Sequence, residues 1–263
     1  MSGFLFCPLA SGSSGNCAYA SLNGAGILID AGLSGIRAEK AIAGVGNAKS
    51  LKAIFATHEH IDHICGMGVL SRRYRIPVYA TQATWDSFDN RGSIGKVDKF
   101  LKKVITPGVP VEISGMEVEA FRIPHDAADP VGYIVRADGK KAVVATDIGH
   151  ATDEVRRGIA DSDALILESN HDLDMLWNGR YPRVLKERIN GDKGHLSNDA
   201  AGELLACAVT GRLKRVYLGH LSEENNSPLI AYCAAAAALG KLGAKHVSLL
   251  VAERHLPSEV VEL

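Results

Sequence analysis

The sequence predicts an α/β fold in which two β-sheets pack face to face and helices cover their outer faces. Short apolar runs rich in β-forming residues alternate with helical patterns along the whole chain. The strand patterns fall into two groups, and helices accompany each group. Two packed sheets with helices outside would bury such apolar strands. We therefore expect a single α/β domain over residues 1–263.

The first half of the chain opens with three strand patterns separated by Gly and Ser turns. Its apolar periodicity predicts strands at 4–9, 16–22, 25–32, 51–57, 77–81 and 100–106, and helices at 35–45, 61–75 and 83–89. Pro77 ends the second of these helices, because proline cannot continue a helix.

The second half begins with a run of strands and then alternates strands with helices. We expect strands at 111–113, 116–123, 132–137, 141–147, 164–169, 215–220 and 247–252, and helices at 154–161, 182–189, 198–209 and 227–242. The Asp-Gly pair at Asp138 and Gly139 predicts a hairpin turn between two of these strands.

The composition is that of an ordinary globular protein, with 46% hydrophobic and 22% charged residues. The net charge of -1 excludes a global positive field, so a nucleic acid partner would need a local basic patch. The five cysteines form no C-x-x-C pair, which excludes a zinc ribbon or a dithiol redox site. Because no signal peptide and no run of ~18 apolar residues is seen, we expect a cytoplasmic protein without a membrane partner. The sequence does not indicate an oligomeric state.

The segment HEHIDH at 58–63 is the densest group of metal-binding side chains. His58 and His60 follow an apolar strand, and residues i and i+2 of an extended chain project to the same side, so both can reach one ion. Asp62 and His63 stand where the next helix begins, which directs them to a neighbouring spot and indicates a second ion. The H-E-x-x-H pattern of zinc peptidases is not met, because Asp62 occupies its last position. A surface His-rich loop is the alternative interpretation.

Four further ligand-competent residues stand at the ends of apolar strands. They are Asp30, His125, Asp147 and His220. Each of them alone could be a structural residue. Beside the cluster at 58–63, their equivalent positions predict a site for two metal ions.

In these residues and their order, the chain resembles the metallo-β-lactamase superfamily. The motifs of that family are matched, in sequence order, by Asp30, the cluster His58, His60, Asp62 and His63, then His125, Asp147 and His220. The resemblance covers essentially the whole chain and implies a four-layer αββα sandwich. It implies one metal ion held by His58, His60 and His125. It implies a second ion held by Asp62, His63 and His220, with Asp147 bridging both and Asp30 orienting a ligand histidine or the bridging water.

Within the superfamily, the chain is most similar to the YycJ/WalJ group of exonucleases. The matching segments include SGSSGN at 11–16, THEHIDH at 57–63, ATDIGH at 145–150 and two copies of GHLS. The resemblance implies a nuclease. Relatives with the β-CASP insertion process RNA and DNA, but this chain has no room for that insertion between Asp147 and His220, and there it departs from those larger nucleases.

The two copies of GHLS, at 194–197 and 219–222, predict different roles for their histidines. His220 ends an apolar strand, which suits a metal ligand. His195 precedes a helix that Ser197 or Asn198 caps, and a helix N-terminus favours an anion. We expect His195 to bind a phosphate oxygen or to protonate the leaving oxygen. A histidine that merely belongs to the capping loop is the alternative.

Other substrate contacts are expected from a loop, a strand end and basic clusters. The SGSSGN loop either surrounds a phosphate or is a plain β-turn; its candidate residues are Ser11, Ser13, Ser14 and Asn16. Glu168 or His171 could orient His195 or line the cleft. Basic residues cluster at 72–75, 96–103 and 180–188. These clusters are solvated faces unless one of them flanks the site, where it would bind phosphate groups.

The leading hypothesis is a two-metal phosphodiesterase, a 5′→3′ exonuclease on DNA or RNA. Two divalent ions can clamp the attacking and leaving oxygens, and a hydroxide that bridges them is available near neutral pH. Asp62 and Asp147 would act through the ions, and His195 would supply a proton. His and Asp ligands admit zinc or manganese, and also iron.

Two other functions stay open at this point. A small-molecule metallohydrolase acting on a cyclic phosphodiester, thioester or lactone predicts a closed pocket and a weak salt dependence of KM. A non-hydrolytic iron redox protein is disfavoured, because His60 stands where that version carries a carboxylate and no chain remains for a flavin domain.

Overall fold

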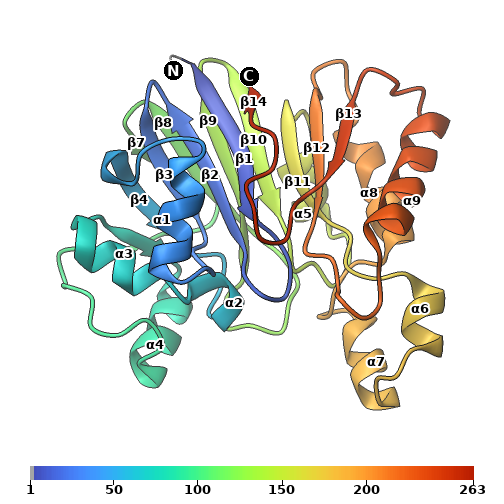
Figure 1. Cartoon of the computed structure of the whole chain (residues 1–263), viewed down its shortest axis with the longest axis horizontal. Helices are drawn as coiled ribbons and strands as arrows, with labels where there is room; N and C mark the ends of the chain where they lie inside the picture. The colour runs from blue at the N-terminus through green and yellow to red at the C-terminus, as the bar shows by residue number, and fades with distance from the viewer. Residues whose placement is uncertain (1–2) are drawn as a thin grey trace.

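The computed structural model describes residues 3–263 and contains two seven-stranded β-sheets (Figure 1). The first sheet has the strand order β14-β1-β2-β3-β4-β5-β6. Its strands are β1 (Phe4–Ala10), β2 (Cys17–Leu22), β3 (Ala25–Ile29), β4 (Leu51–Phe55), β5 (Val78–Ala80), β6 (Lys102–Val104) and β14 (Val261–Glu262). The strands β1, β2 and β3 are antiparallel neighbours, whereas β3 to β6 run parallel.

The second sheet repeats this plan with the strand order β13-β12-β11-β10-β9-β8-β7. Its strands are β7 (Val111–Ile113), β8 (Met116–Arg122), β9 (Val131–Ala137), β10 (Lys140–Ala145), β11 (Ala164–Glu168), β12 (Arg215–Gly219) and β13 (Ser248–Val251). The strands β7 to β10 are antiparallel, and β10 to β13 run parallel. Within each sheet, the parallel strands therefore share one carboxyl-terminal edge.

Helices cover the outer face of each sheet. Those of the first half are α1 (Gly35–Ala43), η1 (Ala48–Ser50), α2 (Ile61–Ile64), α3 (Met67–Tyr74) and α4 (Gln82–Arg91). Those of the second half are α5 (Asp153–Ile159), α6 (Leu173–Asn178), α7 (Arg183–Ile189), α8 (Asn198–Ala208) and α9 (Pro228–Lys241). Figure 1 shows α1, α3 and α4 on one side of the pair of sheets, and α8 and α9 on the other.

Three clusters of buried apolar side chains fill the spaces between these layers. The strand β1 shows how they are separated: Phe4 and Phe6 belong to the cluster between the sheets, whereas Cys7 and Leu9 belong to the cluster under the first group of helices. A third cluster lies between the second sheet and α5, α8 and α9. Because both faces of each sheet are covered, the strands are apolar almost throughout. The four-layer αββα sandwich is confirmed.

The structure departs from the predicted elements in two respects. Residues 61–75 form the two helices α2 and α3, because the chain at Gly66 packs against another loop. A Cβ at Gly66 would lie 2.2 Å from the carbonyl oxygen of Leu33, so this position has no room for a side chain. The elements η1, α6 and β14 are not predicted, since each is too short to show a period. Among residues 3–263, no helix has the length and apolar character needed to cross a bilayer.

Candidate metal centre

The predicted site residues meet at the carboxyl-terminal edge of the two sheets. Asp30 follows β3 and His58 follows β4 in the first sheet, whereas Asp147 follows β10 and His220 follows β12 in the second. Because β8 runs in the same direction as β10, the loop after β8 brings His125 to this edge as well. The site therefore lies across the seam between the sheets and takes side chains from both.

Three of these residues have a left-handed backbone, with φ of 61° at Asp30, 60° at Asp147 and 56° at His220. This conformation is uncommon for residues other than glycine, costs of order 1–3 kcal/mol, and concentrates at functional sites. Backbone hydrogen bonds stabilise this conformation at two of the three residues. The N–H of Asp30 donates to the Phe55 carbonyl at 2.8 Å, and the N–H of His220 donates to Ser11 Oγ at 2.8 Å. The left-handed conformation at these three residues directs each side chain into the site.

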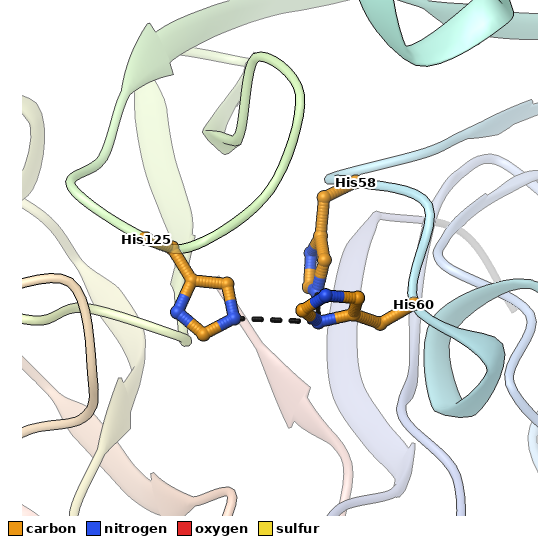
Figure 2. A group of neighbouring side chains, drawn as sticks. All are labelled: His58, His60 and His125. Atoms are coloured by element: carbon orange, nitrogen blue, oxygen red, sulfur yellow. Dashed lines mark hydrogen bonds between the residues drawn. The ribbon is translucent and has the colours of Figure 1, made fainter. Parts of the chain in front are cut away.

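His58, His60 and His125 form the first group of ligand atoms (Figure 2). Nε2 of His58 lies 3.0 Å from Nδ1 of His60, and that Nδ1 lies 3.4 Å from Nε2 of His125. Burial and the neighbouring imidazoles lower the pKa of His58 well below its ordinary value, so this ring is neutral. Imidazoles whose nitrogens lie this close together are the arrangement that a divalent transition metal binds.

Asp62, His63 and His220 form a second group beside the first. Oδ2 of Asp62 lies 3.5 Å from Nε2 of His63 and 3.5 Å from Nε2 of His220. Asp62 and His63 come from α2 in the first half of the chain, and His220 from the end of β12 in the second. The structure thus contains two adjacent groups of candidate ligand atoms, as the sequence predicts.

Asp147 lies between the two groups. Its Oδ2 is 3.3 Å from Nε2 of His63, and its Oδ1 is 3.5 Å from Nδ1 of His220 and 3.8 Å from Nε2 of His125. The Oδ2 atom is buried without a hydrogen-bond donor. Since a buried carboxylate oxygen without a partner is costly, its position fits a bound cation. The mixed set of imidazoles and carboxylates fits divalent metal ions.

Charges at the site favour a cation. Burial disfavours the imidazolium of His63, but the carboxylates of Asp147, Asp30 and Asp62 raise its pKa well above the ordinary value. Burial also opposes charging of His220, yet Asp147 and two hydrogen-bonded carboxylates raise the pKa of that ring to about 10. The same carboxylates would stabilise a divalent ion, which binds the deprotonated form of each ring.

The ring nitrogens that face away from the site are hydrogen-bonded to fixed partners. The pairs are His63 Nδ1 with Asp30 Oδ2 at 2.7 Å, His58 Nδ1 with Thr57 Oγ1 at 2.9 Å, His125 Nδ1 with the Gly194 carbonyl at 3.1 Å, and His220 Nδ1 with Glu168 Oε1 at 3.0 Å. Such partners set the tautomer and orient the ring, so that the opposite nitrogen is free for a metal. Asp30 thus contacts His63, one of the candidate metal ligands.

Glu168 is a fully buried acceptor for four groups. Its Oε1 contacts Nδ1 of His195 at 2.8 Å and Nδ1 of His220 at 3.0 Å. Its Oε2 accepts the N–H groups of Ile148 at 2.7 Å and Leu196 at 3.1 Å. Burial acts to raise its pKa, but the two histidines keep the pKa below the usual range. Of the two roles expected for Glu168, its burial allows the orientation of His195 and not direct contact with substrate.

Glu59 is a buried residue of the cluster whose role the sequence does not reveal. Its carboxylate accepts the N–H of Ala128 at 3.0 and 3.2 Å. This bond ties the loop that carries His125 to the segment that carries His58 and His60. The sequence shows only that Glu59 is an acidic residue between two candidate ligands. It does not indicate that Ala128 is the hydrogen-bond partner of Glu59.

His195 lies at the rim of the two groups. Its ring centroid is 5.1 Å from that of His125 and 5.2 Å from that of His220, and its side chain is 21% exposed. Ser197, not Asn198, caps α8, with its side chain accepting the N–H of Ala200. His171, the other candidate from the same region, is buried and contacts Asn190 instead.

A cleft of about 270 Å³ opens over the metal-ligand groups. The side chains of Ser13, Asn170 and Ser222 line one part of it, and residues of α7 line another. Within the SGSSGN loop, Ser13 alone lines the cleft. Ser11 is bonded to the His220 backbone, and Asn16 Nδ2 lies 3.3 Å from Asp62 Oδ2.

Most main-chain N–H groups of the loop are already bonded within the protein. The N–H groups of Ser11, Gly12, Gly15 and Asn16 all donate to acceptors of the protein. Ser14 is exposed and does not line the cleft. Ser11 and Asn16 instead brace the metal-ligand groups, which corrects the expectation that they contact substrate. The plain-turn alternative describes this loop better, except at Ser13.

One of the three predicted basic clusters flanks the site. Arg188, from the cluster at 180–188, lines the cleft and pairs with Asp126, whose Oδ1 lies 3.4 Å from Nε2 of His125. Arg73 pairs with Glu39 on α1, and Lys102 pairs with Asp89 on α4. The clusters at 72–75 and 96–103 do not line the cleft.

Sequence comparisons agree with the geometry. Residues 26–221 match the family model described as "Beta-lactamase superfamily domain". The chain is 39% identical to exodeoxyribonuclease WalJ of Streptococcus pneumoniae serotype 2 over 231 residues, which cover 88% of this chain and 86% of that protein. It is also 39% identical to exodeoxyribonuclease YycJ of Bacillus anthracis over 230 residues, covering 87% and 86%.

The metallo-β-lactamase fold protein YhfI from Bacillus subtilis is similar in structure, with a TM-score of 0.75 over 99% of this chain and 100% of that one. Zn(2+)-bound PqqB from Methylobacterium extorquens gives a TM-score of 0.69 over 97% and 99%. Both are 17% identical to this chain, so they show the fold alone.

Proposed function

The chain belongs to the metallo-β-lactamase superfamily, in the group of the WalJ and YycJ exodeoxyribonucleases, and on this premise we propose that its site hydrolyses phosphodiester bonds at the ends of DNA strands. The observation that carries the proposal is the convergence of two groups of metal-ligand atoms on either side of Asp147. The proposed direction of digestion is 5′→3′.

We propose that His58, His60 and His125 hold one divalent ion, and that Asp62, His63 and His220 hold the other. Asp147 would bind both, which is supported by the position of its carboxylate within 4 Å of ring nitrogens from both groups. When bound, such a pair of ions lowers the pKa of water and offsets negative charge on a phosphoryl group. The proposed ions are zinc or manganese, with iron as a further candidate, because this donor set accepts all three.

His195 is the proposed general acid. The hydrogen bond from its Nδ1 to Glu168 leaves Nε2 as the proton-carrying or accepting atom toward the cleft. Its partial exposure at the rim allows contact with substrate, whereas His220 is almost fully buried. In this position His195 would donate a proton to the leaving oxygen, and Glu168 would stabilise the charged ring.

DNA is the proposed substrate because both curated relatives, at 39% identity, carry the name exodeoxyribonuclease. Contacts in the cleft support a strand end: Arg188 offers a cation, and Ser13 and Ser222 offer hydroxyl groups. The protein has no excess positive charge, so binding must depend on such local contacts.

The proposal is tested by digestion of end-labelled DNA and RNA oligonucleotides with and without EDTA. We expect release of mononucleotides from DNA that starts at the 5′ end, stops with EDTA and returns with added zinc or manganese. Labels at the 5′ and 3′ ends, followed over time, give the direction. Cleavage that ignores EDTA would rule out the metal mechanism.

A small-molecule phosphodiesterase is the second candidate, and the size of the cleft favours it. A volume of about 270 Å³ lies at the small end of ligand pockets, which span roughly 300–1,000 Å³. This candidate predicts metal-dependent hydrolysis of cyclic phosphodiesters, a KM that is insensitive to salt, and no action on oligonucleotides. The same panel of substrates therefore separates the two functions.

A further inference from the structure

The helix α7 is unusual in this fold because none of its residues is buried. In Figure 1, α6 and α7 project beyond the edge of the sandwich where the parallel strands end. The segment is nevertheless fixed: Lys186 Nζ donates to the carbonyl groups of Trp177 and Gly179, each at 2.8 Å. The N–H of His195 donates to the Ile189 carbonyl at 2.8 Å. Hydrogen bonds, and not burial, therefore hold α7 in place beside the site.

One face of this segment lines the cleft. Its residues are Tyr181, Leu185, Arg188 and Ile189. Leu185, Arg188 and Ile189, at i, i+3 and i+4, are neighbours along one side of α7, and Tyr181 lies just before the start of the helix. The face combines an aromatic ring and two aliphatic side chains with a guanidinium group. A nucleotide presents the matching pair of surfaces, an apolar base face and a phosphate.

Among residues 3–263, Arg188 is the only Lys or Arg that lines the cleft. Its Nε donates to Oδ2 of Asp126 at 2.7 Å, and its side chain is still 64% exposed. An exposed pair of this kind contributes little to stability, so a phosphate can compete for the guanidinium at small cost. Through Asp126, the guanidinium also lies close to His125 in the first metal-ligand group.

Ser13, Asn170 and Ser222 add polar side chains to the lining, and the whole cleft has a volume of about 270 Å³. This volume is just below the roughly 300–1,000 Å³ of pockets that hold one small ligand. A cleft of this size suits a single nucleotide better than a base pair.

We propose that the segment 181–189, which contains α7, binds the terminal nucleotide of the substrate strand in an unpaired state. Arg188 binds its 5′-phosphate, and Tyr181 with Leu185 packs against its base. This inference rests on the proposed function, because it assigns the substrate end that the metal centre acts on. It makes the enzyme dependent on a 5′-phosphate and on an accessible terminal base.

The phosphate contact is tested by direct binding, which does not require catalysis. Fluorescence anisotropy would measure the affinity of single-stranded DNA with a 5′-phosphate and with a 5′-hydroxyl, at several salt concentrations. We expect the wild type to bind the phosphorylated strand about tenfold or more tightly, and Arg188→Ala to lose this preference. For the phosphorylated strand, the slope of log affinity against log salt should fall by about 0.7, the value for one phosphate contact on a single strand.

Arg183→Ala is the matched control. This residue lies on the same helix, pairs with Glu187, and does not line the cleft. It should keep both the preference for phosphate and the salt slope. A wild type without preference, or an Arg188→Ala variant that keeps it, would overturn the assignment of Arg188.

The base contact is tested with a strand whose 5′-terminal nucleotide is abasic. Stacking on an aromatic ring contributes the equivalent of roughly a 5–150-fold change in affinity per base. Tyr181→Ala should weaken binding of the ordinary strand by at least about fivefold and that of the abasic strand by much less, and Tyr181→Phe should behave as wild type. Equal losses on both strands would contradict a base contact.

These outcomes are distinct from failure of the proposed function. If oligonucleotides bind with the expected dependence on Arg188 and Tyr181 but are not cleaved, the nuclease proposal fails and the binding inference holds. If oligonucleotides are cleaved in an EDTA-sensitive way while both variants bind like the wild type, the inference fails and the nuclease proposal holds.

Discussion

At the scale of single residues, the two GHLS histidines show how surroundings decide a role. Both share Oε1 of Glu168, at 2.8 Å from Nδ1 of His195 and 3.0 Å from Nδ1 of His220. His220 is 5% exposed and faces Asp62, whereas His195 is 21% exposed and faces the cleft. The same tetrapeptide thus supplies a residue suited to metal and a residue suited to substrate.

We expect Asp147→Ala to lose both metal ions and all measurable activity, because this carboxylate faces both ligand groups. Metal content by mass spectrometry and turnover on DNA would be measured on the same preparation. Asp86→Ala is the control, since Asp86 is an exposed helix carboxylate bonded to Gln82. A variant of Asp147 that retains both ions would contradict its bridging position.

We expect His195→Ala to keep its metal and lose about 10²–10⁴-fold in turnover, the usual contribution of a general acid. His246→Ala, at an exposed histidine near Thr210, should retain full activity. If the His195 variant is instead depleted of metal, then this histidine is a ligand and the assignment to the two GHLS copies is reversed.

The sequence predicts the ligand-competent residues but not the residues that orient them. Spacing alone places His58 and His60 on one side of the chain, since neighbouring positions follow from backbone geometry. Glu59 and Thr57 form hydrogen bonds with Ala128 and Asp30, whose approach depends on tertiary structure. For Glu168, the sequence suggests two roles, and only its burial distinguishes them.

At the scale of elements, the site is built where strands end. Each of β3, β10 and β12 is followed within two residues by a site residue in the left-handed conformation. The apolar strands fix the position of the edge, and the left-handed residue turns the side chain out of the strand direction. The sequence predicts the strands from their apolar runs, but the positive φ at Asp147 or His220 has no local signal.

The loop after β3 packs tightly against the segment that carries Asp62. A Cβ added at Gly32 would lie 1.7 Å from the Asp62 carbonyl oxygen, so the backbone would have to separate there. We expect Gly32→Ala to lower the free energy of unfolding by about 2 kcal/mol or more and to weaken metal binding. Chemical denaturation and metal titration would measure the two effects.

Gly211→Ala is the matched control, because nothing lies within 4 Å of a Cβ at that position and its φ is not positive. This variant should be as stable as the wild type. Wild-type stability and metal affinity in Gly32→Ala would show that the contact between these loops does not hold the site together.

At the scale of the whole molecule, the two halves of the chain meet at the metal centre. The first half supplies His58, His60, Asp62 and His63, and the second supplies Asp147 and His220. Bound ions would connect the two sheets across their seam. The αββα arrangement could be predicted because apolar strands covered on both faces admit few architectures. The helix α6 could not be predicted, because its six residues are too few to show a period, whereas α7 is the helix predicted at 182–189.

We expect metal removal to destabilise the whole fold, because ions that bind only the native state stabilise it by mass action. An ion at about 1,000 times its Kd contributes about 4.1 kcal/mol, which corresponds to a fall in Tm of roughly 8–16 °C for a domain of this size class. Thermal unfolding before and after dialysis against EDTA would measure it, and added metal should restore the original Tm. An unchanged Tm would argue against ions that join the two halves.

The central claim is that two metal ions occupy adjacent positions at the edge of the sandwich. Anomalous diffraction at the absorption edge of the bound metal tests it most directly. The account predicts two peaks about 3.5–4 Å apart, one among His58, His60 and His125 and one among Asp62, His63 and His220, with Asp147 between them. Peaks elsewhere, or no peak in protein that retains EDTA-sensitive activity, would contradict it.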